Sequence, residues 1–154
     1  MTELEFIVDQ IKRSFDGEAW HGPALMEVLE GISASTAAKH AVPSAHSIWE
    51  LVLHIAAWER IIARRTTIKQ ALTLSDEENF PRVADSSEPA WRDALEQLQA
   101  AHAQLIETAV KLNQSRLDER VPGKDYDIRF MLTGAAQHAA YHGGQIALLK
   151  KAAS

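Results

Sequence analysis

The spacing of apolar residues constrains the fold most, because it repeats every three or four positions in four separate segments of the chain. That period is typical of an α-helix with one buried face, whereas a half-buried strand would alternate apolar and polar residues. No sustained alternation of β-branched residues occurs in the sequence. We therefore expect an all-α protein.

The N-terminal part of the chain contains the first of these segments. Its apolar face runs from Leu4 to Phe15, and Asp16-Gly17 ends it. A shorter helical turn is expected between Pro23 and Gly31, because Pro and Gly mark the ends of local structure.

A capping box marks the start of the second main helix. Ser47 and Glu50 have the spacing at which each side chain bonds the backbone N–H of the other residue. The helix fades near Leu72. Its Trp49 and Trp58 could form a platform on which a substrate stacks, although a core position is preferred. Its apolar face contains Leu51, His54, Trp58 and Ile61.

The third helix opens at Ser86, Ser87 and Glu88-Pro89, because Ser favours the N-cap and Pro the first turn. Pro122-Gly123 marks the next loop, and Asp127 is a suitable N-cap for the last helix. The two apolar faces contain Trp91, Leu95, Leu98, His102, Leu105, Ala109 and Leu112, and then Met131, Ala135, His138, His142, Gln145 and Leu149.

Four amphipathic helices with modest connections predict a four-helix bundle. The 154 residues suit one domain, and no repeat or low-complexity tract divides them, so we expect a single domain over residues 1–154.

The net charge is −5 without a clustered Lys/Arg patch, so nucleic acid is not an expected partner. The chain has no cysteine, no basic signal region and no apolar run near the roughly 20 residues of a membrane span. We expect a cytoplasmic protein without membrane contact or disulfides.

Three histidines lie on these apolar faces, where Leu or Ala would be usual. His138 and His142 are one helical turn apart, a spacing that lets two imidazoles bind one ion, and His54 has the corresponding position on the second helix. Each alone could be a hydrogen-bonded core residue. A buried imidazole without a partner costs about 1–3 kcal/mol, so three converging imidazoles require a shared partner. We expect one divalent metal ion bound by all three.

Three neutral imidazoles leave the ion at least one open position, as in catalytic rather than closed structural sites. That position would hold a water molecule whose pKa the ion lowers. Zinc and nickel both suit imidazole ligands, and the sequence does not choose between them.

Other polar residues near these faces have two interpretations each. Gln145 could orient a ligand or a bound water, or it could bond the backbone at the edge of the core. Tyr141 could donate a hydrogen bond near the site, although packing against a neighbouring helix is preferred. His102 could be a fourth ligand, although a core or pocket-lining role is preferred. Glu50 is assigned to the cap rather than to general-base chemistry, and Glu59 to the solvated surface.

Two stretches resemble motifs of the DinB-like superfamily, a family of damage-inducible four-helix bundles. Residues 47–55 (SIWELVLHI) resemble its second-helix motif, and residues 137–146 (QHAAYHGGQI) resemble its last-helix motif. The similarity extends over nearly the whole chain. It implies an up-up-down-down four-helix bundle that holds a metal through three histidines, which correspond to His54, His138 and His142.

The resemblance also bears on function. Characterised members of the DinB-like superfamily include transferases and isomerases that use low-molecular-weight thiols such as mycothiol or bacillithiol. Many other members are described only as metal-dependent hydrolases. It therefore implies a small-molecule substrate, with a low-molecular-weight thiol as a candidate cosubstrate. Several relatives form dimers, which leaves a homodimer open. No residue of this sequence identifies the thiol or the second substrate.

Three hypotheses follow. The first is a metalloenzyme that activates water, as a hydrolase, or a thiolate, as a transferase. The second is a non-catalytic, stress-related bundle that binds a metal or another ligand. The third is a structural helical dimer without a metal.

Overall fold

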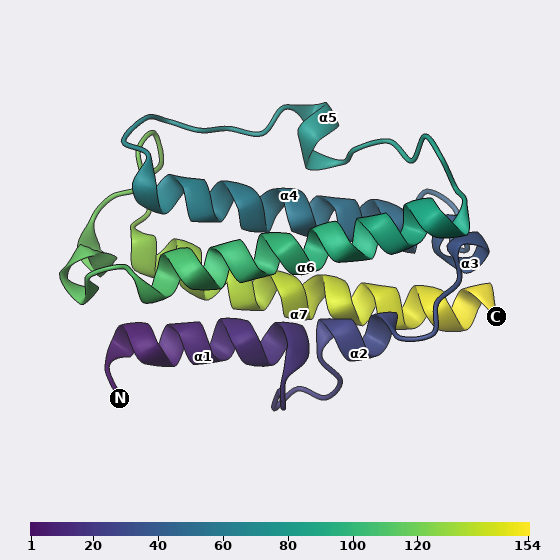
Figure 1. Cartoon of the computed structure of the whole chain (residues 1–154), viewed down its shortest axis with the longest axis horizontal. Coiled ribbons are helices and arrows are strands. Elements are labelled where there is room, and N and C mark those ends of the chain that lie inside the picture. Colours follow the sequence, from purple (N-terminus) through teal and green to yellow (C-terminus); the bar gives the residue numbers. More distant parts are fainter.

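The computed structural model describes residues 1–154 and consists of helices without strands, which confirms the all-α prediction. The long helices are α1 (Glu3–Asp16), α4 (Ile48–Thr67), α6 (Glu88–Val110) and α7 (Ile128–Ala153), and they lie side by side as a bundle (Figure 1). The short elements are α2 (Leu25–Leu29), α3 (Ala34–Ala38), α5 (Asp76–Asn79) and the 3₁₀-helix η1 (Gln114–Asp118). None of the helices combines the length and the apolar character that crossing a bilayer requires.

Side-chain caps explain where the long helices begin. At α4 the Glu50 N–H donates to Oγ of Ser47 over 3.1 Å, and the Ser47 N–H donates to the Glu50 carboxylate over 2.6 Å. The predicted capping box is therefore confirmed. Ser87 caps α6, and Asp127 caps α7 as its sequence position predicted.

The long helices run up, down, down and up in chain order, which corrects the up-up-down-down order implied by the family resemblance. Glu3 and Arg129, at the starts of α1 and α7, form an ion pair, so these helices are parallel. The rings of Trp49 and Trp91, at the starts of α4 and α6, lie 5.1 Å apart, so these helices are parallel too. The end of α4 meets the segment just before α7, which makes α4 and α7 antiparallel.

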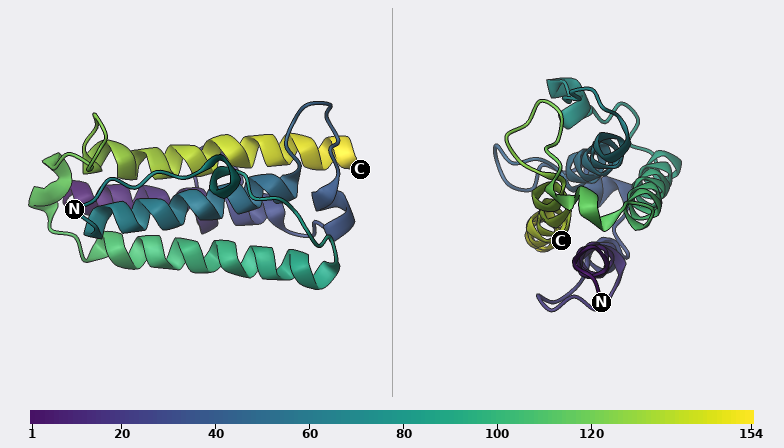
Figure 2. Two further views of the ribbon diagram at one scale, coloured as in Figure 1. Left: turned by 90° about the horizontal axis from the view of Figure 1, so that it is seen from above. Right: turned by 90° about the vertical axis from the view of Figure 1, so that its left-hand side faces the viewer.

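The position of the long crossover is the physical reason for this order. Residues 68–87 run back along the length of the bundle and carry α5 on the way (Figure 1, Figure 2), so α6 starts beside the start of α4. Residues 17–47 instead fold into α2 and α3 near one end of the bundle. The predicted extension of the second helix to about Leu72 is wrong, because α4 ends at Thr67 and the Leu72 carbonyl turns back to accept hydrogen bonds from Arg65.

Two groups of buried apolar side chains fill the bundle. One surrounds Trp49 and Trp91 and joins α2, α3 and α4 to α6 and the C-terminal part of α7. The other surrounds Ile11 and Leu132 and joins α1 to the opposite ends of α4, α6 and α7. The groove between α4 and α7 is lined partly by polar side chains, including Asn79 from the end of α5. This groove contains the candidate site.

Candidate metal centre

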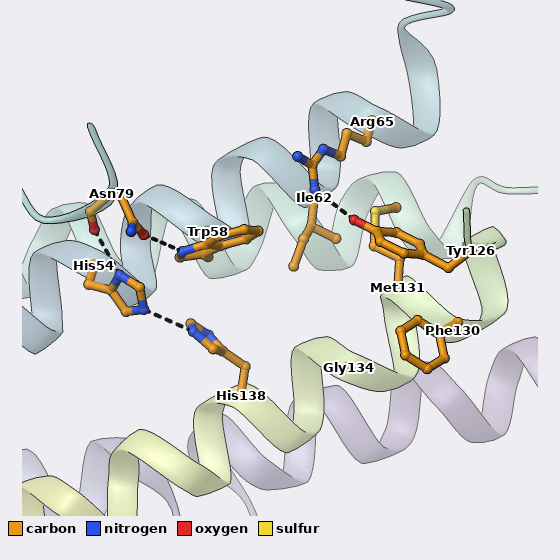
Figure 3. A pocket seen from close by; sticks show the side chains of 10 residues that line it. All are labelled: His54, Trp58, Ile62, Arg65, Asn79, Tyr126, Phe130, Met131, Gly134 and His138. Carbon is orange, nitrogen blue, oxygen red and sulfur yellow. Dashed lines mark hydrogen bonds between the residues drawn. The ribbon is translucent and has the colours of Figure 1, made fainter. Parts of the chain in front are cut away.

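Three histidine rings converge between α4 and α7. His54 lies in the second turn of α4, and His138 and His142 lie one turn apart in α7. The Nε2 atom of His138 lies 3.1 Å from Nε2 of His54 and 3.1 Å from Nε2 of His142. Figure 3 shows His54 and His138 pointing toward one another across the groove. These three side chains could hold a metal ion.

Oxygen acceptors hold the outer nitrogens of two of these rings. Nδ1 of His54 donates to the backbone carbonyl of Asn79 over 2.7 Å, and Nδ1 of His142 donates to Oε1 of Gln145 over 2.6 Å. Because carbonyl oxygens only accept, each Nδ1 carries the hydrogen and each Nε2 keeps its lone pair. Both lone pairs therefore face the centre of the site, as metal ligation requires.

This donor set fits a divalent ion better than it fits hydrogen bonding among the rings. Nε2 of His138 has one hydrogen at most, which could serve only one of the two neighbouring lone pairs. The other ring would keep a buried acceptor without a donor, which is costly. Zinc–nitrogen bonds of about 2.0–2.1 Å at tetrahedral angles place ligand nitrogens roughly 3.3 Å apart. The two pairs that include His138 Nε2 are 3.1 Å apart, and the three donor atoms all lie within 4.8 Å of one another.

Burial keeps the three imidazoles neutral. Desolvation, followed by charge repulsion from His142 and His54, lowers the pKa of His138 to about 3. Desolvation also lowers the pKa of His54 and the pKa of His142. Since only neutral imidazole binds a metal, the rings are in the ligating form at neutral pH without losing a proton first.

A cavity of about 350 Å³ opens beside His54 and His138 and follows the groove between α4 and α7 (Figure 3). Trp58 lines this cavity and is only partly buried, so its expected place in the core is wrong, whereas Trp49 is buried as predicted. The indole N–H of Trp58 donates to Oδ1 of Asn79 over 2.8 Å. One face of the histidine cluster is thus accessible to a small molecule.

Two residues of the site were not predicted from the sequence. Asn79 holds both His54 and Trp58, and the ring of Phe80 stacks on His54 with the centroids 4.1 Å apart. A capping box between Ser75 and Glu78 signals a helical turn at this point. It does not indicate what the turn contacts, and any residue type could supply the backbone carbonyl that holds His54.

The remaining candidates lie in different places. Gln145 contacts His142, as described above, whereas the Tyr141 side chain is 65% exposed on the outer side of α7. This exposure does not favour packing against a neighbouring helix, and the Tyr141 ring centroid lies 5.1 Å from that of His142. His102 lies away from the cluster, with Nδ1 3.2 Å from both carboxylate oxygens of Glu59 and its ring stacked on Phe15 at 3.7 Å. The structure gives His102 a core position rather than that of a fourth ligand.

The expected solvated position of Glu59 is wrong. Its residue is only 3% exposed, because this face of α4 packs against α6 rather than facing water. Burial raises the pKa of the Glu59 carboxyl, although its hydrogen bond with His102 opposes this shift. Glu50 remains at the start of α4, where its carboxylate also contacts Nε2 of His40 over 3.0 Å.

Comparison with known proteins gives one informative result. A family model described as the DinB superfamily matches residues 19–146, a span that includes all three histidines of the cluster. Comparison with curated proteins and with solved structures gave no match.

Proposed function

This chain belongs to the DinB superfamily, and on that premise we propose that it is a metalloenzyme acting on a small molecule in the cavity beside His54 and His138. The observation that carries the proposal is the orientation of the rings. Nδ1 of His54 and Nδ1 of His142 each donate a hydrogen bond to an oxygen. The Nε2 lone pairs of the same two rings therefore face a common point beside an accessible cavity. A closed structural site would not need such access.

The side chains around the cluster have separate tasks in this proposal. Asn79 and Gln145 orient the rings of His54 and His142, which fixes the geometry of the ligand set. Phe80 covers one face of His54, and Trp58 forms the adjoining cavity wall. Together these apolar rings limit the access of bulk water to the reacting end of the cavity.

A divalent ion bound here would supply Lewis-acid activation of water or of a thiol. These two nucleophiles correspond to a hydrolase and to a thiol-dependent transferase. The chain has no cysteine, so the thiol of a transferase has to come from a cosubstrate. The proposal covers both reactions, because the cavity next to the cluster is accessible to either nucleophile.

Elemental analysis of the purified protein tests the metal. We expect about one divalent ion per chain, and its loss on substituting His54, His138 or His142 by Ala. His21→Ala, in an exposed loop, is the matched control and should keep the ion. Full metal content in all three site variants would refute the site.

Turnover measurements test the enzyme. The metal-loaded protein is assayed against activated esters and amides, and separately against electrophiles with a low-molecular-weight thiol. Saturable turnover in one arm that disappears in His138→Ala supports the proposal and selects the nucleophile. A fully loaded protein without turnover in either arm would indicate a non-catalytic metal-binding bundle instead.

A further inference from the structure

Arg65 is a buried cation without an anionic partner at the far end of the cavity from the histidine cluster. Its residue is 3% exposed and it lines the cavity. The ion pairs of the structure do not include it. Buried charges in proteins are normally paired, because removing an ion from water is expensive. The position therefore lacks an anion that a ligand could supply.

The hydrogen bonds of Arg65 leave part of its donor capacity free. Nε and Nη2 donate to the Leu72 carbonyl over 3.1 and 2.7 Å, and Nη1 donates to the Tyr126 hydroxyl over 3.1 Å. A guanidinium has five N–H groups, so two N–H groups of Arg65 have no acceptor in the protein. Both oxygen acceptors that it does have are neutral, and so is the Trp58 ring, over which the guanidinium lies with Cζ 5.7 Å from the ring centroid. The Tyr126 hydroxyl accepts from Arg65 and can donate its own hydrogen to an anion.

The cavity between Arg65 and the histidines is lined mainly by apolar side chains. His54, Trp58 and Ile62 follow one face of α4 toward Arg65, which lies about 16 Å of helix rise beyond His54. Because α7 runs antiparallel to α4, Met131 lies across the groove at the Arg65 end of the cavity, while His138 lies near His54 at the other end (Figure 3).

A glycine keeps this passage open. A Cβ atom built on Gly134 would meet no other atom within 4 Å. Gly134 also lines the cavity, one turn before His138 on α7. A side chain at this position would therefore extend into open space in the groove and occupy part of the cavity.

We infer that the cavity binds a small molecule with an apolar body and one carboxylate. The carboxylate binds the free N–H groups of Arg65 and the Tyr126 hydroxyl, and the body lies against Trp58 and Met131. The opposite end of the molecule reaches the histidine cluster. Arg65 is the sole Lys or Arg among the lining residues, which favours a singly charged carboxylate over a doubly charged phosphate. Binding of the carboxylate and of the apolar body does not depend on the proposed metalloenzyme function. Only a reaction at the end of the ligand that reaches the histidine cluster rests on that function.

Calorimetric titration of the chelated, metal-free protein tests the inference, because a carboxylate then has no metal to bind. The probes are 4-phenylbutanoate, the alcohol 4-phenylbutan-1-ol and the ester 4-phenylbutyl phosphate, which share one apolar body. We expect the carboxylate to bind at least about tenfold more tightly than the alcohol, as for a hydrogen-bonded charge. We expect it to bind more tightly than the phosphate as well. Equal binding of acid and alcohol, or tighter binding of the phosphate, would overturn the inference.

Variants locate the binding in the cavity. Gly134→Leu should abolish binding of 4-phenylbutanoate, whereas Gly144→Leu, at an exposed helical glycine of α7 with equal open space, should leave it unchanged. Arg65→Met should remove the preference for acid over alcohol. Since Arg65 also holds the Leu72 carbonyl, Tyr126→Phe is a milder second variant and should weaken the acid more than the alcohol. Unchanged acid binding in Gly134→Leu would overturn the inference.

The two proposals fail separately. Carboxylate binding by the metal-free protein without turnover in any assay would support the cavity and refute the metalloenzyme. Turnover of substrates with no preference for a carboxylate, together with equal binding of acid and alcohol, would support the metalloenzyme and refute the carboxylate-binding cavity.

Discussion

Gln145 lies one turn beyond His142 on α7, and its side-chain oxygen accepts the Nδ1 hydrogen of that ring. Replacing it by Ala should lower metal affinity about 10- to 100-fold, because an unheld imidazole has to be oriented by the ion itself. Gln145→Glu keeps an acceptor and should retain most of the affinity. Competition with a chromophoric chelator measures the effect, with the exposed Gln137→Ala on α7 as control. Equal affinity in Gln145→Ala would show that packing alone orients His142.

Glu59 is a second residue with a measurable signature, and it lies outside the metal centre. Its pKa is raised by burial above the ordinary 4.5, so the folded protein holds this proton to higher pH than the unfolded chain. Its contribution to stability is therefore complete below about pH 4.5 and is lost as pH rises through the folded pKa. Glu59→Gln keeps an oxygen that accepts from His102 but removes the buried charge.

We expect Glu59→Gln to raise the free energy of unfolding at pH 8 by on the order of 1 kcal/mol, with a smaller gain at pH 5. Urea denaturation at both pH values measures the difference. Glu96→Gln, on the exposed side of α6, should show no such gain. If Glu59→Gln is destabilised at pH 8, the ion pair with His102 stabilises the fold by more than burial costs.

At the scale of the helix, the start of α6 provides a paired comparison. Oγ of Ser87 accepts from the Ala90 N–H over 3.3 Å, and one turn later Trp91 donates to the Ile32 carbonyl, which ties α6 to the segment before α3. Ser87→Ala should lower the free energy of unfolding by about 1 kcal/mol, because an N–H of the first turn loses its acceptor. Ser86→Ala, next to it but outside the cap, should change stability little. Equal losses in urea denaturation would contradict the cap assignment.

At the scale of the whole molecule, an ion held between α4 and α7 couples metal binding to folding. A ligand that binds only the folded state at a hundredfold excess over its Kd stabilises by about 2.7 kcal/mol. For a chain of this length, chelation should therefore lower Tm by roughly 5–10 °C. His54→Ala should melt at a temperature that does not respond to the chelator. An unchanged Tm of the parent protein after verified metal removal would show that the histidines are satisfied without an ion.

Much of the fold and of the site could be predicted, because the relevant rules are local. The helical period of the apolar residues indicated the long helices, and Ser47 with Glu50 located the start of α4 from contacts within a single turn. The same period placed His54, His138 and His142 on inward faces, since residues three or four apart share one side of a helix. None of these inferences required knowing which helices are neighbours.

The tertiary structure alone decided what those faces meet. The crossover at residues 68–87 sets the direction of α6 and brings the Asn79 carbonyl to His54. Packing of α6 on α4 buries Glu59. Because α7 runs antiparallel to α4, Tyr126, just before α7, lies beside Arg65 at the end of the cavity. Each of these contacts joins residues more than ten positions apart in the chain, and a backbone carbonyl has no sequence signature at all. Local spacing fixes the faces of a helix, whereas the pairing of faces depends on how distant segments pack.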